Sequence, residues 1–138
     1  MPMTLTLTEG VLAKEDEQIA AKRIVDAMLK WHGLSGNGKM TPNVTTMINV
    51  LPKEATLSGG EPFSGVWIEW KTPQFAFNGR EIQQGFFKEA TDIIEQLAAG
   101  SVSRDRIFSN VVHTVDGTWN MDGKAMSNEE IGQAIASA

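Results

Sequence analysis

The two halves of the sequence repeat one order of elements, a strand, a helix and a second strand. The predicted segments are, in chain order, residues 1–8, 14–32 and 44–51 in the first half and 66–70, 82–97 and 107–113 in the second. Apolar residues recur at helical spacing in the middle segments, and the outer segments alternate or are rich in β-branched residues. A crossover helix makes the two strands that it joins parallel. The sequence therefore predicts an α+β (α/β) fold: two β-α-β units, about 1–58 and 62–115, forming a four-stranded sheet with two helices on one face.

Length and composition set the outer limits. At 138 residues with 41% hydrophobic residues, we expect residues 1–138 to form a single domain that ends in a turn and a short helix. The net charge of −5 argues against nucleic acid or an anionic membrane as a partner. The absence of cysteine excludes disulfides and thiolate catalysis. No apolar run approaches the roughly 18 residues of a membrane span, and no leader precedes the first strand, so a cytoplasmic location is expected.

The C-terminal stretch contains a glycine-bounded turn, Asp116 to Gly123, that carries Trp119. After this turn, Ser127 and Glu130 have the spacing of a capping box, in which each side chain bonds to the backbone of the other residue. A short final helix is therefore predicted to begin just after Ser127.

The predicted sheet has one face without a covering layer. Trp67, Phe75 and Phe77 have no obvious place in a two-layer monomer. We therefore expect copies of the chain to pack sheet face to sheet face, most simply as a closed ring.

Pro2 opens the first strand and is the first candidate for chemistry. If Met1 is removed, as is usual before a small residue, the mature chain begins with a prolyl secondary amine. An α-amino group titrates near ~7.7 to 8.0, and burial lowers this pKa, so a buried prolyl nitrogen is neutral at physiological pH and suited to general base catalysis. The alternative is that Pro2 is only the residue after the start codon.

Arg80 is the second candidate, because a cation at the start of a helix is unfavourable unless an anion lies beside it. The sequence predicts Asn78 as the N-cap of the second helix and Arg80 in its first turn. A guanidinium next to helix amides makes a good carboxylate site. The alternative is a solvated arginine that pairs with Glu81 or Glu69.

Two other patterns carry less weight. Gly33 to Lys39 resembles the start of a phosphate-binding loop, but Met40 stands where a Ser or Thr is required, and the segment follows a helix. His32 and His113 lack the spacing of metal ligands, and they fit better as the end of a helix and the end of a strand. We expect no metal and no cofactor.

Pro2 at the start of a strand, two β-α-β units, Arg80 at the second helix and the late turn around Trp119 together resemble the tautomerase superfamily. The resemblance covers nearly the whole chain, and the nearest branches are those of malonate semialdehyde decarboxylase and cis-3-chloroacrylic acid dehalogenase. It implies a homotrimer, a cofactor-free site at the mature N-terminal proline, and small carboxylate substrates with an oxo, enol or halovinyl group. Pro2 matches the catalytic proline, Arg80 the carboxylate-binding arginine, and Trp119 the tryptophan of the decarboxylase branch.

The sequence departs from these branches at several positions. Phe77 and Asn78 occupy the places where a second arginine is expected, and Met28 stands where the dehalogenase branch has a histidine. Asn120, Met121 and Asp122 occupy the region of the glutamate that activates water in that branch. These departures argue against hydrolytic dehalogenation.

The leading hypothesis is a keto-enol tautomerase of small 2-oxo and enol carboxylates, because this reaction needs only a base, an anion site and an apolar wall. Pro2 transfers the proton and Arg80 binds the carboxylate. Trp119 and Phe77 line the pocket, and Asn120 polarises the carbonyl.

Two alternatives stay open at this stage. The first is a decarboxylase, hydratase or dehalogenase of three-carbon acids, in which the prolyl nitrogen acts as an acid and Asp122 is the weak candidate to activate water. The second is an oligomeric binding protein without catalytic activity.

Overall fold

A computed structural model describes all 138 residues of the chain. The helices are α1 (Lys14–Trp31), α2 (Arg80–Ala98) and α3 (Asn128–Ala136). The strands are β1 (Met3–Thr8), β2 (Thr46–Leu51), β3 (Leu57–Ser58), β4 (Glu61–Pro62), β5 (Val66–Pro73), β6 (Ile107–Thr114), β7 (Trp119–Met121) and β8 (Lys124–Met126). Short 3-10 turns occur at η1 (Thr41–Asn43), η2 (Lys53–Ala55) and η3 (Arg104–Arg106). The strand expected from Val44 begins later, because the Val44 N–H closes the η1 turn by donating to Met40 and Thr41.

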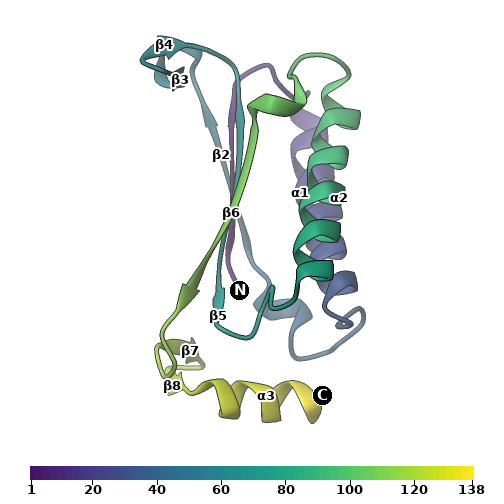
Figure 1. Cartoon of the computed structure of the whole chain (residues 1–138), viewed down its shortest axis with the longest axis vertical. Helices are drawn as coiled ribbons and strands as arrows, with labels where there is room; N and C mark the ends of the chain where they lie inside the picture. Colours follow the sequence, from purple (N-terminus) through teal and green to yellow (C-terminus); the bar gives the residue numbers. More distant parts are fainter.

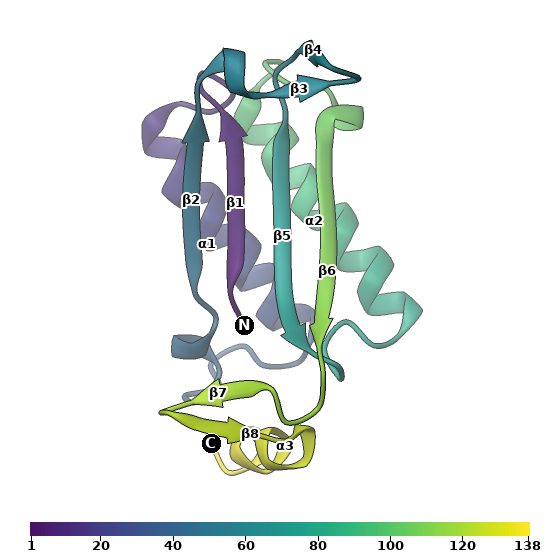
Figure 2. The ribbon, with the colours of Figure 1, turned by 90° about the vertical axis from the view of Figure 1, so that its left-hand side faces the viewer.

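The main sheet has the strand order β2-β1-β5-β6. β1 runs parallel to β2, β5 runs parallel to β6, and the central pair β1 and β5 is antiparallel. This topology confirms the two predicted β-α-β units and sets them side by side. Because Met3 pairs with Trp70, the start of β1 lies at the end of the sheet where β5 stops and the chain turns toward α2 (Figure 2).

Both long helices cover one face of the sheet (Figure 1). Met3, Leu5 and Leu7 point toward the helices and are completely buried, whereas the threonines between them are half-buried on the opposite face. This alternation is the period of two that a strand requires when only one of its faces is buried. Trp70 from β5 and Phe86 from α2 are the largest side chains in the buried layer, and their ring centroids lie 5.9 Å apart.

The opposite face of the sheet is open, as predicted (Figure 1). Met47, Phe108 and Val112 lie on it with 60%, 43% and 53% of their surface exposed, and Trp67 is half-buried there. Exposed apolar side chains gathered on one face indicate a surface for association.

The expectation that Phe75 and Phe77 also lack a place in the monomer is wrong. Phe77 is only 2% exposed, and Phe75 is half-buried against the same core. The loop after β5 carries both residues to the helix side of the sheet, where the Phe77 ring lies 5.1 Å from that of Phe86. Packing against the core removes the Phe77 ring and part of the Phe75 ring from water without a second copy of the chain.

Three aromatic rings cluster on the open face near the β3–β4 hairpin. Trp67 and Phe108 are stacked with centroids 6.0 Å apart, and Phe63 meets the Trp67 ring edge-on at 5.7 Å. The guanidinium of Arg106 lies 5.6 Å from the Phe63 ring centroid. The cluster therefore lies at the end of the sheet away from the chain start (Figure 2).

The C-terminal segment lies beyond the end of the sheet at which β1 begins (Figure 2). β7 and β8 form a hairpin across the turn at Asp122 and Gly123, and α3 follows it. The predicted capping box is present: the Ser127 hydroxyl accepts from the Glu130 N–H at 3.2 Å, and the Glu130 carboxylate accepts from the Ser127 N–H at 3.0 Å. Ile131 is buried on the inner side of this helix.

Gly85 lets α1 and α2 approach each other closely. A Cβ at this position would lie 2.2 Å from Cη2 and 2.4 Å from Cζ2 of Trp31. The indole is held in place by a hydrogen bond of 3.2 Å from its Nε1 to Glu89. The small glycine is therefore required by the packing of the two helices.

Replacing Gly85 by Ala is expected to lower the free energy of unfolding by about 1–3 kcal/mol, because overpacking outweighs the better helix propensity of alanine. Gly132 in α3 is the matched control, since a Cβ there meets nothing within 4 Å. G132A is expected to raise the stability by up to about 1 kcal/mol. Urea unfolding measures both variants, and equal stabilisation by G85A would contradict the close contact.

Candidate active site

The start of the chain is held between β2 and β5. The Lys71 N–H donates to the Pro2 carbonyl at 3.1 Å, and the Thr45 N–H donates to the Met1 carbonyl at 3.2 Å. The amine of Met1 donates to the Asn43 carbonyl. Proline fits the position just before β1 because it has no N–H to leave unpaired. Pro2 is half-buried and held from both sides.

Burial changes the chemistry of an amine at this position. Met1 is only 2% exposed and belongs to the hydrophobic core. Loss of solvent lowers the pKa of the Met1 amine from 8.0 to about 5, because burial disfavours the ammonium form. The Met1 amine is therefore mostly neutral at pH 7. With Met1 in place the Pro2 nitrogen is an amide without basicity, so the predicted prolyl base requires removal of Met1.

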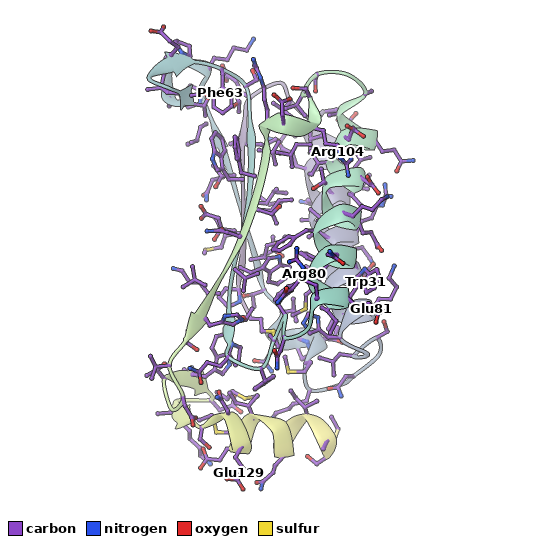
Figure 3. The ribbon with its side chains drawn as sticks, in the orientation of Figure 1. Trp31, Phe63, Arg80, Glu81, Arg104 and Glu129 are labelled. Carbon is purple, nitrogen blue, oxygen red and sulfur yellow. The ribbon has the colours of Figure 1, made fainter.

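Arg80 is the first residue of α2, and Figure 3 shows it on the side of the helix toward the sheet. The expectation that Asn78 caps this helix is wrong: the N-cap is Gly79, which has φ 114° and makes no side-chain cap bond. The chain enters the helix through a left-handed Phe77, with φ 55°, followed by this glycine. Only glycine adopts such a φ without strain.

The Arg80 side chain has no acidic partner. Its Nη1 donates to Gln83 Oε1 at 3.4 Å, and none of the ion pairs in the structure includes it. The alternative pairing with Glu81 or Glu69 is therefore not formed. An exposed guanidinium at a helix start without a counter-ion favours the binding of an anion from solution.

His32 holds the turn that leads to Arg80. The Phe77 N–H donates to His32 Nε2 at 2.9 Å, and His32 Nδ1 lies 2.8 Å from the Met28 carbonyl. Because Nε2 accepts, the proton is on Nδ1 and the ring is neutral. Gln83 continues the chain of bonds: its Nε2 donates to the Phe77 carbonyl at 2.9 Å, and its Oε1 accepts from Arg80. A continuous path of hydrogen bonds thus runs from the end of α1 to Arg80.

The neutral state of His32 predicts a pH dependence of stability. Burial lowers the pKa of His32, and the bond to the Met28 carbonyl opposes this shift. The unfolded chain therefore binds a proton more readily, so the stability is complete above the unfolded pKa of about 6.5 and falls as the pH drops toward the folded value. The Met1 amine, where present, acts in the same direction.

We therefore expect His32→Gln to weaken the loss of stability between about pH 7 and about pH 5, since glutamine accepts a hydrogen bond but does not titrate. Urea unfolding of the wild type and H32Q at both pH values isolates the histidine from the amine, which both proteins share. An equal loss in the two proteins would contradict the buried neutral imidazole.

A cavity of about 370 Å³ lies between the start of α2 and β6. The residues that line it are Phe77, Arg80, Gln83, Phe87, Ser109, Asn110, Val111 and His113. The rings of Phe77 and Phe87 are nearly parallel with centroids 6.3 Å apart and form an apolar wall. A guanidinium beside an apolar wall suits a small organic carboxylate.

The other candidate residues lie outside this cavity in a single chain. Trp119, the first residue of β7, is half-buried against the core, and Asn120 is exposed opposite Ala125 in the hairpin. Pro2 does not line the cavity either. The chain start, β7 and the first turn of α2 lie at the same end of the sheet (Figure 2). One chain thus brings Phe77 and Arg80 together in the cavity, whereas Pro2, Trp119 and Asn120 belong to segments at the same end of the sheet and do not line it.

Reasoning from the sequence missed the histidines of this region. His113 lies in the same cavity as Arg80, and its Nε2 is 2.8 Å from the Ala76 carbonyl, to which it donates. The Ser109 hydroxyl, also in the cavity, is buried without a hydrogen-bond partner. The alternation along β6 could have placed His113 in this region, because it puts Ser109, Val111 and His113 on the helix side of the strand.

No three or more His, Asp or Glu side chains lie close enough together to hold a metal ion. The helices are also too short or too polar to cross a membrane.

Comparison of the sequence with family models and with curated proteins found no match. Solved structures, in contrast, match nearly the whole chain. FG41 malonate semialdehyde decarboxylase, inhibited by 3-bromopropiolate, is 17% identical over 99% of this chain and 98% of its own, with a TM-score of 0.71. N1, a member of the cis-3-chloroacrylic acid dehalogenase family, is 12% identical over 96% of this chain and 90% of its own, with a TM-score of 0.74. Pt0534, inactivated by 2-oxo-3-pentynoate, is 17% identical over 96% of this chain and 99% of its own, with a TM-score of 0.75.

These structural neighbours are enzymes of the tautomerase superfamily. The chain has the fold of that superfamily, so the resemblance inferred from its sequence is confirmed at the level of the fold. Fused 4-OT proteins described as symmetric and asymmetric trimers match equally well, with TM-scores of 0.72 and 0.75 at 10% and 11% identity. Identities this low establish the fold, while the reaction has to be argued from the residues of this chain.

Proposed function

We propose that the protein is a cofactor-independent keto-enol tautomerase of small 2-oxo and enol carboxylates, with Pro2 as the base after Met1 is removed. The observation that carries the proposal is the buried start of the chain, which is held in place by hydrogen bonds and where burial lowers the pKa of the Met1 amine to about 5. The same low-dielectric surroundings favour a neutral Pro2 nitrogen once Met1 is removed. A neutral secondary amine takes a proton from the carbon beside the carbonyl, the C–H electron pair becomes the C=C bond, and the proton is delivered to the carbonyl oxygen to give the enol. In the reverse direction the amine takes the enol proton and delivers it to the carbon.

The remaining roles follow from charge and position. Arg80, which lacks an acidic partner, binds the substrate carboxylate. Phe77 and Trp119 form the apolar wall, and the Asn120 amide donates a hydrogen bond to the carbonyl oxygen. Stabilising the charge that develops on this oxygen speeds its formation.

We extend the proposal to a homotrimer in which neighbouring copies complete each site. The open face of the sheet carries exposed apolar side chains, and fused 4-OT relatives form trimers. Pro2 does not line the cavity of Arg80 within one chain. The simplest source of the guanidinium that binds the substrate carboxylate beside Pro2 is therefore Arg80 of another copy.

The alternative chemistry is decarboxylation, hydration or dehalogenation with a protonated Pro2 as the acid. It requires a residue that activates water, and Asp122 is the available carboxylate. This residue is exposed at the tip of the hairpin with φ 53°, and nothing holds its carboxylate toward the site. The geometry therefore favours tautomerisation.

The test is the pH dependence of kcat/KM for phenylenolpyruvate, measured on protein whose intact mass shows the loss of Met1. A prolyl base predicts activity that rises with pH and reaches a plateau above the Pro2 pKa, and a prolyl acid predicts activity that falls. A panel of enol, oxo and haloacrylate acids covers the alternative reactions. Absence of turnover of every member would overturn the proposal in favour of a binding protein.

A further inference from the structure

Met1 occupies a buried space directly beside the nitrogen of the proposed base. It is 2% exposed, and its side chain is part of the hydrophobic core. Its backbone is hydrogen-bonded to Asn43 and Thr45 in the segment between η1 and β2, where Val44 is also buried. If Met1 is removed, as the proposed function requires, this apolar space adjoins the free Pro2 nitrogen.

The same space contains two backbone groups that Met1 alone satisfies. The Thr45 N–H donates to the Met1 carbonyl at 3.2 Å, and the Asn43 carbonyl accepts from the Met1 amine. The Met1 carbonyl carbon is bonded to the Pro2 nitrogen, so an oxygen that replaces the Met1 oxygen lies within reach of the base. Removal of Met1 takes away the acceptor of the Thr45 N–H beside the Pro2 nitrogen, so this N–H can donate to an oxygen of a ligand.

We propose that the space filled by Met1 is the substrate subsite of the mature enzyme: it takes an unbranched apolar substituent of a 2-oxo acid, and the Thr45 N–H binds the carbonyl oxygen of that acid. Met1 itself indicates which ligand fits, because it offers a carbonyl to the Thr45 N–H and an apolar chain to the buried space. The subsite sets the substrate class as 2-oxo acids with an alkyl or thioether chain about as long as the methionine side chain.

The first experiment measures the affinity of the mature protein for straight-chain 2-oxo acids from pyruvate to 2-oxooctanoate by isothermal titration calorimetry. Affinity is expected to rise by about fourfold for each methylene that enters the pocket, and to level off once the chain exceeds the length of the methionine side chain. Affinity that does not depend on chain length would overturn the proposal.

The second experiment compares the mature protein with the same chain that retains Met1, produced while methionine aminopeptidase is inhibited. The retained residue fills the subsite, so the gain in affinity with chain length should disappear. Equal affinity of both forms for 2-oxohexanoate would show that the ligand binds elsewhere. Neither experiment needs a substitution, so neither depends on the folding of a variant.

The Thr45 N–H is tested by T45P, which removes the donor but keeps the carbonyl that accepts from the Met3 N–H at 2.8 Å. T45P is expected to weaken the binding of 2-oxohexanoate by roughly tenfold, and T45A, which keeps the N–H, should lose less than T45P. An equal loss in the two variants would contradict the role of the N–H.

These measurements separate the subsite from the proposed reaction. Binding that follows chain length in a protein without turnover supports the subsite and overturns the tautomerase. Turnover of phenylenolpyruvate with no dependence on chain length supports the tautomerase and overturns the subsite.

Discussion

Replacing Pro2 by Ala is expected to lower kcat/KM for phenylenolpyruvate by at least about tenfold, out of the roughly 10²–10⁴-fold that a positioned general base contributes. Alanine also permits removal of Met1, so the variant keeps an amine at the same place. The pyrrolidine ring fixes the direction of the prolyl nitrogen, whereas a primary amine rotates about its bond to Cα. Part of the base function therefore survives, and most of the rate is lost.

Two further proteins make this result interpretable. P62A replaces an exposed proline of β4, at the opposite end of the sheet, and should leave the turnover unchanged. The chain that retains Met1 has an amide in place of the base and should lose the full rate enhancement that the general base contributes. P2A with the activity of the wild type would refute the assignment of Pro2.

The elements of the fold were predictable because local patterns determine them. The apolar residues at helical spacing form the buried sides of α1 and α2, for example Ile24 and Ile93. The alternation in β1 places Leu5 and Leu7 in the core. The capping box that starts at Ser127 depends on residues three positions apart. Patterns of this kind lie within a few residues of the sequence and need no knowledge of the rest of the chain.

The surroundings of the candidate site were not predictable, because they depend on contacts between distant segments. His32 and Phe77 are 45 positions apart, and the hydrogen bond between them holds the Phe77 backbone in the left-handed region. This conformation is rare for residues other than glycine and asparagine. The burial of Met1 likewise depends on the segment around Asn43 and Thr45. Pro2 and Arg80 were proposed as site residues from their chemistry, but their relation in space was not readable from the sequence.

Replacing Arg80 by Ala is expected to lower kcat/KM by roughly 10- to 100-fold, the equivalent of a charge-assisted hydrogen bond to the substrate carboxylate. The carboxylate is charged in the substrate and in the transition state alike, so the loss should appear mainly as a higher KM. R80K keeps the charge but not the two-pronged geometry and should lie between wild type and R80A. R23A is the control, because Arg23 is exposed on α1 and donates to Gln96. An unchanged KM in R80A would contradict the proposed carboxylate site.

Mixing R80A with P2A tests whether Pro2 and Arg80 of one site come from the same copy of the chain or from two copies. P2A and R80A are unfolded together in equal amounts and refolded, so that mixed oligomers form. If Pro2 and Arg80 come from different copies, about a quarter of the sites in a random mixture contain both native residues, and activity returns to about that fraction. We expect this recovery, because Pro2 does not line the cavity of Arg80 within one chain. Failure of the mixture to exceed the mean activity of the two variants would place both residues in a site formed by a single copy.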